Sequence, residues 1–320
     1  MGPTKLSYNA RMANLAAGLL VILAGLGIGG PAPVLAADRM IMAEQFTATW
    51  CGYCPQAGRA LISLQDMYPD TFAMIQIHGQ DGYETAWGTH RRFTFYAPWV
   101  GYPTVWFCGE DKLVGGDEEE ILFNLYRGRY FLYRARPVDV SVTVGAEQVG
   151  GATYAVRAQV RMDADGEAKT VRLYIASVLN NYPTGTQYEN CLVDPAPTVT
   201  DVSLEPGESA IVETQITFDP YNTNIELIAW VQEPYSTGPA IIYNADKMAY
   251  PLEILTPVGD MNCDGAIDSY DIDGFICAVS PACDYEDMYP TCDRQLADCN
   301  NDSAINAYDI DWFIDIMSGG

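Results

Sequence analysis

Two cysteines in the N-terminal half are spaced for thiol–disulfide chemistry. They lie in the stretch Trp50-Cys-Gly-Tyr-Cys54-Pro55, a Cys-x-x-Cys motif. The surrounding pattern predicts a strand, a loop and a helix whose first turn carries the motif. Unsatisfied N–H groups and the dipole at a helix N-terminus stabilise a thiolate. We therefore expect Cys51 to attack a disulfide and Cys54, shielded by the first turn, to resolve the mixed disulfide.

The same spacing has two other interpretations. Zinc sites use Cys-x-x-Cys, but they normally need a second pair of ligands, and no second cysteine pair lies near Cys51 and Cys54 in the sequence. A purely structural disulfide is the second alternative, and it stays open at this point.

A different chemistry is predicted near the C-terminus, where one twelve-residue pattern occurs twice. The copies begin at Asp260 and at Asp298, 38 residues apart. Side-chain oxygens fall at positions 1, 3, 5, 9 and 12, and position 7 offers a backbone carbonyl, as in a calcium-binding loop. The predicted metal ligands are Asp260, Asn262, Asp264, Ala266, Asp268 and Asp271 in the first copy, and Asp298, Asn300, Asp302, Ala304, Asn306 and Asp309 in the second.

The two copies differ at position 6. Gly265 suits the positive φ that this turn needs, whereas Ser303 replaces glycine in the second copy, so we expect the second loop to be strained and to bind calcium more weakly. Apolar residues at helical spacing follow each loop. We expect the two helices to pack antiparallel through Ile272, Phe275 and Ile276 against Ile310, Phe313 and Ile314.

This loop-plus-helix unit in duplicate, ending with Asp where an EF-hand uses Glu, resembles the dockerin type I domain over about residues 259–318. The resemblance implies two bound Ca²⁺ ions and a cohesin-like partner protein. Positions 10 and 11 of each loop would face that partner; here they are Ser269, Tyr270, Ala307 and Tyr308. The alternative is an acidic, solvated tail.

The N-terminal pattern continues as strand, helix, strand, helix, two strands and helix. Together with Trp-Cys-x-x-Cys on the first helix and Tyr102-Pro103-Thr104 opening the third strand, it resembles the thioredoxin superfamily over about residues 38–136. The resemblance implies that Pro103 is cis and lies beside the disulfide, so Pro103 is grouped with Cys51 and Cys54 as a catalytic-site residue. Gln45 stands where thioredoxin has a buried Asp, and alternation should turn Glu44 to the opposite face.

Between these parts, residues 138–256 contain short runs that alternate with period two, separated by Gly, Pro, Asn and Asp. Seven or eight antiparallel strands of this kind predict a β-sandwich, without a pair of carboxylates placed for glycoside hydrolysis. A thioredoxin-like domain followed by such a sandwich is similar to a family of outer-membrane-associated bacterial proteins of poorly known function. The Ile-His-x-x-Asp stretch at 77–81 and Gly-Tyr-Pro-Thr at 101–104 support that likeness.

Composition indicates a secreted protein, and the resemblance just described implies a bacterial one that is periplasmic, extracellular or at the cell surface. Residues 1–37 read as a signal peptide cleaved near Ala36, with a retained anchor as the alternative, and no membrane span is expected after cleavage. The net charge of −25 disfavours nucleic acid as a partner. Nine cysteines suit an oxidising compartment. Five of them follow residue 258, so at least one there lacks a local partner, and Cys108 with Cys191 form either a disulfide or two buried thiols.

We therefore expect a multidomain chain with four segments: a signal peptide (1–37), an α/β thioredoxin-like domain (38–137), an all-β sandwich (138–257) and a small all-α dockerin-like calcium-binding module (258–320). Three functions compete. The first is thiol–disulfide exchange with protein thiols and disulfides, with the chain docked to an assembly. The second is a non-catalytic binding or structural protein on a thioredoxin scaffold. The third is a glycan-binding accessory of a polysaccharide-degrading assembly.

Overall fold

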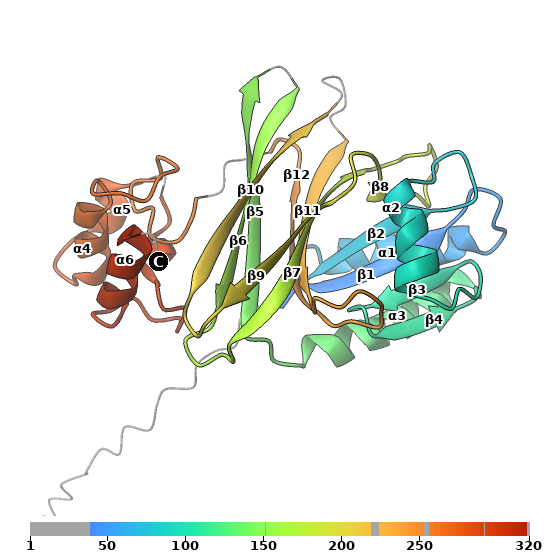
Figure 1. Ribbon diagram of the computed structural model, residues 1–320, viewed down its shortest axis with the longest axis horizontal. Coiled ribbons are helices and arrows are strands. Elements are labelled where there is room, and N and C mark those ends of the chain that lie inside the picture. The colour runs from blue at the N-terminus through green and yellow to red at the C-terminus, as the bar shows by residue number, and fades with distance from the viewer. Residues whose placement is uncertain (1–38, 151, 219–223, 253–255, 291, 319–320) are drawn as a thin grey trace, which may run out of the picture. The chain divides into compact units, whose positions relative to one another are not determined.

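The computed structural model describes residues 39–150, 152–218, 224–252, 256–290 and 292–318. The predicted signal peptide, residues 1–37, lies outside these ranges. The described residues form a mixed α/β structure with six α-helices and two β-sheets (Figure 1). None of the helices in this part of the chain is both long and apolar enough to cross a bilayer.

The N-terminal strands and helices follow the predicted order. Strand β1 (Ile41–Thr47) pairs in parallel with β2 (Phe72–His78) and antiparallel with β3 (Thr104–Phe107), and β3 pairs with β4 (Asp111–Val114). Because successive side chains of a strand point to opposite faces, β1 contributes to two separate cores. Ile41 and Ala43 pack with the helices α1 (Cys54–Met67) and α3 (Glu119–Arg134).

The other face of this sheet is covered in part by the helix predicted around residues 84–96. It is observed as α2 (Ala86–His90), which runs directly into the π-helix η1 (Arg91–Phe95). Thr85 caps α2, because its side-chain oxygen accepts a hydrogen bond from the Gly88 N–H at 3.0 Å. The wider turn of η1 brings Arg91 and Arg92, consecutive in sequence, both into the interior.

The middle part of the chain is built from strands, as its alternating pattern predicts. Three of them form a separate sheet in the order β10-β6-β5: β5 (Val140–Gly150), β6 (Thr153–Met162) and β10 (Ser209–Thr217). Four others belong to the first sheet: β7 (Lys169–Leu179), β9 (Thr198–Leu204), β11 (Ile225–Gln232) and β12 (Ile242–Ala249).

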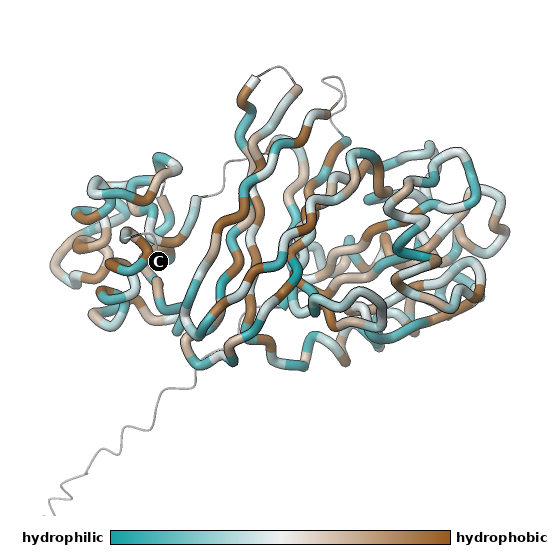
Figure 2. Tube along the Cα trace, viewed as in Figure 1, coloured by the Kyte–Doolittle hydropathy of each residue, from teal (hydrophilic) through white to brown (hydrophobic). Residues whose placement is uncertain are grey.

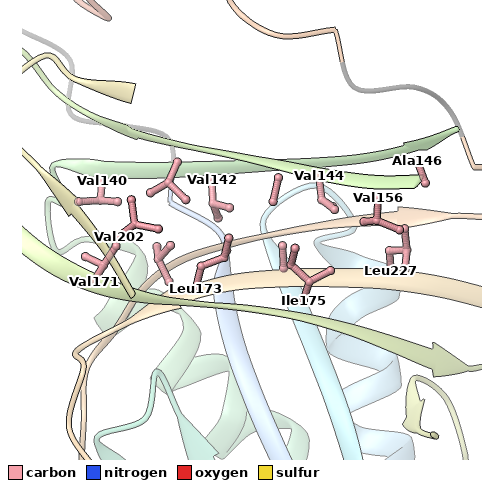
Figure 3. Packing of buried hydrophobic residues seen from close by; sticks show 14 of the residues in the cluster. Val140, Val142, Val144, Ala146, Val156, Val171, Leu173, Ile175, Val202 and Leu227 are labelled. Carbon is pink, nitrogen blue, oxygen red and sulfur yellow. The ribbon is translucent and has the colours of Figure 1, made fainter. Parts of the chain in front are cut away.

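Apolar residues recur along the strands of both sheets (Figure 2). Those on the facing sides form one buried cluster, in which Val140, Val142 and Val144 of β5 lie opposite Leu173 and Ile175 of β7 (Figure 3). The period-two alternation of each strand therefore accounts for the side chains that fill this core.

A short strand connects the N-terminal and middle parts. Strand β8 (Cys191–Leu192) pairs in parallel with β2 at Gln76 and antiparallel with β7, so the larger sheet runs β12-β11-β7-β8-β2-β1-β3-β4 without a break. A second buried cluster contains Met42 and Phe46 from β1 together with Trp230 from β11. The two parts thus share a sheet and a core, although the sequence suggested a boundary at residues 137 and 138.

The C-terminal part has a helix after each duplicated loop, as predicted: α4 (Ile272–Val279) and α6 (Asp309–Ser318). The helix α5 (Tyr285–Met288) and a 3₁₀ turn (Arg294–Ala297) lie between them in sequence. Disulfides join Cys263 to Cys292 and Cys277 to Cys283, and Cys299 is free and buried. The expectation of one unpaired cysteine in this part is confirmed.

The predicted packing of these helices is only partly correct. The rings of Phe275 and Phe313 stack with their centroids 4.0 Å apart, and both are buried. The four isoleucines assigned to the same interface are instead exposed: Ile272, Ile276, Ile310 and Ile314. The small core is completed by Met261, Tyr285 and the disulfides, and Trp312, Ile316 and Met317 of α6 pack against it in place of the predicted isoleucines.

Candidate functional site

Cys51 and Cys54 form a disulfide immediately before helix α1. The helix begins at Cys54, with Pro55 in its first turn, so Cys51 lies in the preceding turn rather than inside the helix as predicted. That turn is closed by a hydrogen bond from the Cys51 N–H to the Ala48 carbonyl at 3.0 Å. The disulfide therefore lies at a helix N-terminus, where N–H groups lack helical partners.

Aromatic side chains surround this disulfide. Trp50 and Tyr53 are 60% and 63% exposed, whereas Cys51 is only 8% exposed, because Tyr102 packs against it. Cys51 is therefore largely shielded from solvent. The Tyr102–Pro103 peptide bond is cis, as the resemblance implied, and the Tyr102 ring makes an edge contact with Trp50 at 5.5 Å between centroids.

Strand alternation separates the two polar residues that precede the motif. Gln45 is buried on the disulfide side, where its Nε2 donates to the Cys54 carbonyl at 3.4 Å and its Oε1 accepts from Gln76. Glu44 lies on the opposite face and forms a bidentate ion pair with Arg91. Arg91 Nε donates to Oε1 at 2.7 Å and Nη2 donates to Oε2 at 2.9 Å. Gln45 cannot take up a proton as a carboxylate can, so the side chain beneath Cys54 supplies no acid or base.

The segment after β2 holds the turn that presents Cys51. The Thr49 N–H donates to Asp81 Oδ2 at 2.8 Å, and the indole N–H of Trp50 donates to the Gln80 carbonyl at 2.9 Å. Asp81 also accepts from His78 Nδ1 at 2.8 Å. The Ile-His-x-x-Asp pattern was the only signal in the sequence for these two residues.

A free thiol lies on the far side of His78. Cys191 Sγ is 3.8 Å from His78 Nε2 and 3.2 Å from Gln76 Oε1, and it is fully buried. Burial lowers the pKa of His78 in spite of Asp81, and it raises the pKa of Cys191 well above its ordinary value. Cys191 is therefore a neutral thiol without access to solvent, and of the two alternatives for Cys108 and Cys191 the structure has two buried thiols.

A buried arginine connects the same segment to Tyr102. Arg92 donates from Nη2 to Glu84 at 2.6 Å and from Nη1 to the hydroxyl of Tyr102. Glu84 in turn accepts from the Gln80 N–H at 2.8 Å. A Cβ on Gly79 would lie 1.3 Å from Arg92 Nη1, so a larger residue there would displace the guanidinium of Arg92. The contacts from Thr49 to Tyr102 thus surround one side of the disulfide.

The duplicated loops adopt matching conformations. In each, the first aspartate accepts hydrogen bonds from the N–H groups at positions 5 and 6, and the aspartate at position 12 accepts from positions 3 and 9. Position 6 has positive φ in both, +87° at Gly265 and +66° at Ser303. The conformation that favours glycine is therefore also imposed on a serine.

The loop residues fit calcium in donor chemistry. All the side-chain donors are oxygens, which Ca²⁺ prefers, and the loops repeat the same turn conformation. Burial raises the pKa of Asp260 to about 6, and the neighbouring charges of Asp271 and Asp264 add to that rise. Within the described residues, however, no three His, Cys, Asp or Glu side chains converge closely enough to hold a metal ion, and the carboxylates bond to loop N–H groups.

The residues assigned to partner binding lie at the end of each loop. Tyr270 and Tyr308 are 75% and 80% exposed, and Ser269 and Ala307 are exposed beside them. The exposed isoleucines of α4 and α6 follow directly in sequence. Each copy of the motif therefore carries a tyrosine and two isoleucines that the fold does not bury.

Comparison with known proteins gives a fold and no family. No family model matches the chain, and no curated protein matches it. Among solved structures, HBP35 of Porphyromonas gingivalis is similar over 66% of this chain and 75% of that one, with 18% identity and a TM-score of 0.51. Protein AGR_C_4864 from Agrobacterium tumefaciens is similar over 67% of this chain and 96% of that one, with 16% identity and a TM-score of 0.47. The first similarity is consistent with a thioredoxin-like α/β fold in this chain.

Proposed function

We propose that this chain is a secreted thiol–disulfide exchange protein. The observation that carries the proposal is the Cys51–Cys54 disulfide at the start of a helix, packed against Tyr102 of the cis Tyr102–Pro103 bond. The exposed side chains of Trp50 and Tyr53 flank Cys51 in the sequence. The intramolecular disulfides are consistent with an oxidising, extracellular location. A structural disulfide needs no exposed aromatic surface around it, whereas a protein substrate needs one to bind.

The reaction that these residues support is exchange through a mixed disulfide. In the reduced protein the Cys51 thiolate attacks a substrate disulfide, forming one S–S bond and releasing one substrate thiolate. The Cys54 thiol then loses its proton, attacks Cys51 Sγ, and releases the second substrate thiolate. The protein is oxidised by two electrons and the substrate is reduced by two, and the reverse sequence oxidises a dithiol.

The reduction potential of Cys51–Cys54 tests this proposal. An exchange protein should have a reduction potential between about −120 and −270 mV, the range that thiol–disulfide exchange proteins span. The full chain, equilibrated with glutathione buffers and then alkylated, gives this value from the mass of the Cys51 peptide. A potential below about −300 mV would identify a structural disulfide instead. The low exposure of Cys51 is the observation that favours this scaffold alternative.

We further propose that the C-terminal part is a dockerin-like docking module with two calcium ions. The twelve loop residues named above would hold the ions, which would supply the positive charge that the loop carboxylates lack. The matching conformations of the two loops support this, as does the exposure of Tyr270 and Tyr308. A cohesin-like protein would dock on these tyrosines. Calorimetric titration of the EGTA-treated full chain should reveal two sites, and the absence of heat would leave an acidic tail.

The middle part is proposed as a β-sandwich that supports the redox site rather than acting on a substrate of its own. The support for this is the common core between the facing sheets and the β8 strand that reaches β2. A glycan-binding role was the third expectation from the sequence. No observation on the described strands favours it, and it stays an expectation.

A further inference from the structure

The turn from Ala48 to Cys51 is tethered to the segment that follows β2. The Thr49 N–H and the Trp50 indole both donate to the segment Gln80–Asp81, at 2.8 and 2.9 Å. Thr49 is two residues from Cys51, and the turn itself is closed by the bond from Cys51 to Ala48. A change at Asp81 is therefore transmitted to Cys51 through a single turn of backbone.

The side chain of Asp81 is held firmly in this place. Its side chain is 3% exposed, Oδ2 accepts from His78 as well as from Thr49, and Oδ1 accepts from the Tyr83 N–H at 2.9 Å. Asp81 has acceptors only, so His78 donates from Nδ1 and turns Nε2 toward Cys191. Both carboxylate oxygens are thus occupied, and the residue has little freedom to turn away.

The carboxylate of Asp81 is charged, and none of the described groups that donate to it, on His78, Thr49 and Tyr83, is a cation at neutral pH. Burial would raise the pKa of Asp81, but hydrogen bonds from His78, Thr49 and Tyr83 outweigh that effect and hold it below the ordinary value. The lowered pKa of His78 keeps the imidazole neutral near pH 7. One full negative charge therefore lies beside the turn that carries Cys51.

We propose that Asp81 is a positioning residue for the Cys51–Cys54 pair. Its side chain fixes the turn through the Thr49 N–H, and its charge opposes ionisation of Cys51. The inference rests on the proposed exchange function and adds how the site is tuned. Reduction of the disulfide by two glutathione molecules forms two protein thiols and one glutathione disulfide. At a pH at which the Cys51 thiol ionises, the carboxylate of Asp81 repels the thiolate. The charge therefore shifts the equilibrium between dithiol and disulfide toward the disulfide.

The test is the pH dependence of Cys51 alkylation in the reduced full chain. Asp81→Asn keeps a carbonyl oxygen for the Thr49 N–H and removes the charge. We expect the midpoint of the alkylation profile to fall by about one pH unit, which is a tenfold change in the acid dissociation constant of Cys51. Above that midpoint, the equilibrium with glutathione should move about tenfold toward the dithiol, or about 30 mV.

Asp70→Asn is the matched control, because Asp70 is an exposed aspartate after the opposite end of helix α1. It should leave the midpoint unchanged. Asp81→Ala removes the hydrogen bond as well, and thermal unfolding reports whether each variant folds. An Asp81→Asn midpoint equal to that of the parent chain would overturn the proposal. If the disulfide is structural, its absolute reduction potential is low, whatever the difference between variants. Failure of the proposed exchange function is therefore distinguishable from failure of the positioning role of Asp81.

Discussion

Glu44 and Gln45 are adjacent in β1, and their different surroundings follow from the two faces of a strand. Gln45 lies under the disulfide, and Glu44 lies in the core that the N-terminal and middle parts share. There the guanidinium of Arg91 bonds to Glu44, to Gln232 Oε1 at 2.9 Å and to the hydroxyl of Tyr96. The ring of Phe95 lies 4.1 Å from the same guanidinium. The charge of Arg91 is thus compensated by one carboxylate inside an aromatic cage.

Glu44→Gln should therefore destabilise the protein strongly. The variant leaves Arg91 buried with no opposite charge, and loss of one partner of a buried pair costs about 3–5 kcal/mol. The free energy of unfolding in urea gives this cost. Asp201→Asn is the control, since Asp201 forms a similar two-pronged pair with Arg172 at the surface and should cost less than about 1 kcal/mol. Equal costs for the two variants would contradict this account.

Cys54→Ser should trap mixed disulfides through Cys51. Without the second thiol, the complex formed by the first attack cannot be resolved within the protein. Non-reducing electrophoresis of the reduced variant, mixed with a model protein that still contains its disulfides, would show the adduct. Cys51→Ser is the control and should trap much less, because Cys54 is 3% exposed and lies at the first position of helix α1. Equal trapping by both variants would refute the assigned roles.

At the scale of elements, the two loops differ at position 6, where the backbone has positive φ. Ser303 has a φ of +66°, where a Cβ is unfavourable, while Gly265 occupies the equivalent position at +87°. The left-handed conformation costs a non-glycine residue about 1–2 kcal/mol. If calcium holds each loop in this conformation, the cost at Ser303 reduces the free energy of calcium binding at the second loop.

Ser303→Gly should therefore tighten the weaker calcium site. Relief of about 1 kcal/mol corresponds to about fivefold in affinity. Calorimetry of the full chain, compared with the parent, gives the two dissociation constants. The reverse change, Gly265→Ser, should weaken the other site by a similar factor. If neither substitution changes a constant, position 6 does not limit binding.

Sequence patterns predicted those elements whose side chains alternate against a core. Strands β5 and β6, for example, lie within the range 138–256 that was predicted from alternation. Strand β8 could not be predicted, because two residues carry no periodicity and its pairing depends on a neighbouring sheet. Helical spacing shows that Ile276 and Ile314 belong to an apolar stripe of a helix, but it does not show whether the fold buries that stripe. Their exposure was therefore not predicted. The Asp81 contact with Thr49 joins residues 32 apart, which no local pattern reveals.

At the scale of the whole molecule, the shared sheet makes the N-terminal and middle parts depend on each other. Strand β2 has β1 on one side and β8 on the other, and Arg39 donates to the Ile242 carbonyl at 3.0 Å. The rings of Tyr174 and Trp230 stack at 4.8 Å inside the common core. Neither part can therefore be removed without exposing apolar surface on the other.

A fragment of residues 38–137 should consequently fail to fold. One face of its sheet carries Met42, Phe46 and Trp106, which share a buried cluster with the middle part in the full chain and would lose that part of their packing. Circular dichroism and size-exclusion chromatography of this fragment would show an unfolded or aggregated species, whereas residues 38–257 should give a cooperative transition. A monomeric, cooperatively unfolding short fragment would show that the two parts are independent.

The three buried free thiols, Cys108, Cys191 and Cys299, place a constraint on how the chain is made. While the chain is still unfolded in an oxidising environment, nine thiols compete for oxidation, and most pairings among them are wrong. The native set forms only if these three are sequestered before oxidant reaches them. The yield of native protein should accordingly depend on whether these thiols are buried faster than they are oxidised. Expression in a compartment that oxidises slowly, or that supplies an isomerase, should raise the yield of correctly bonded protein.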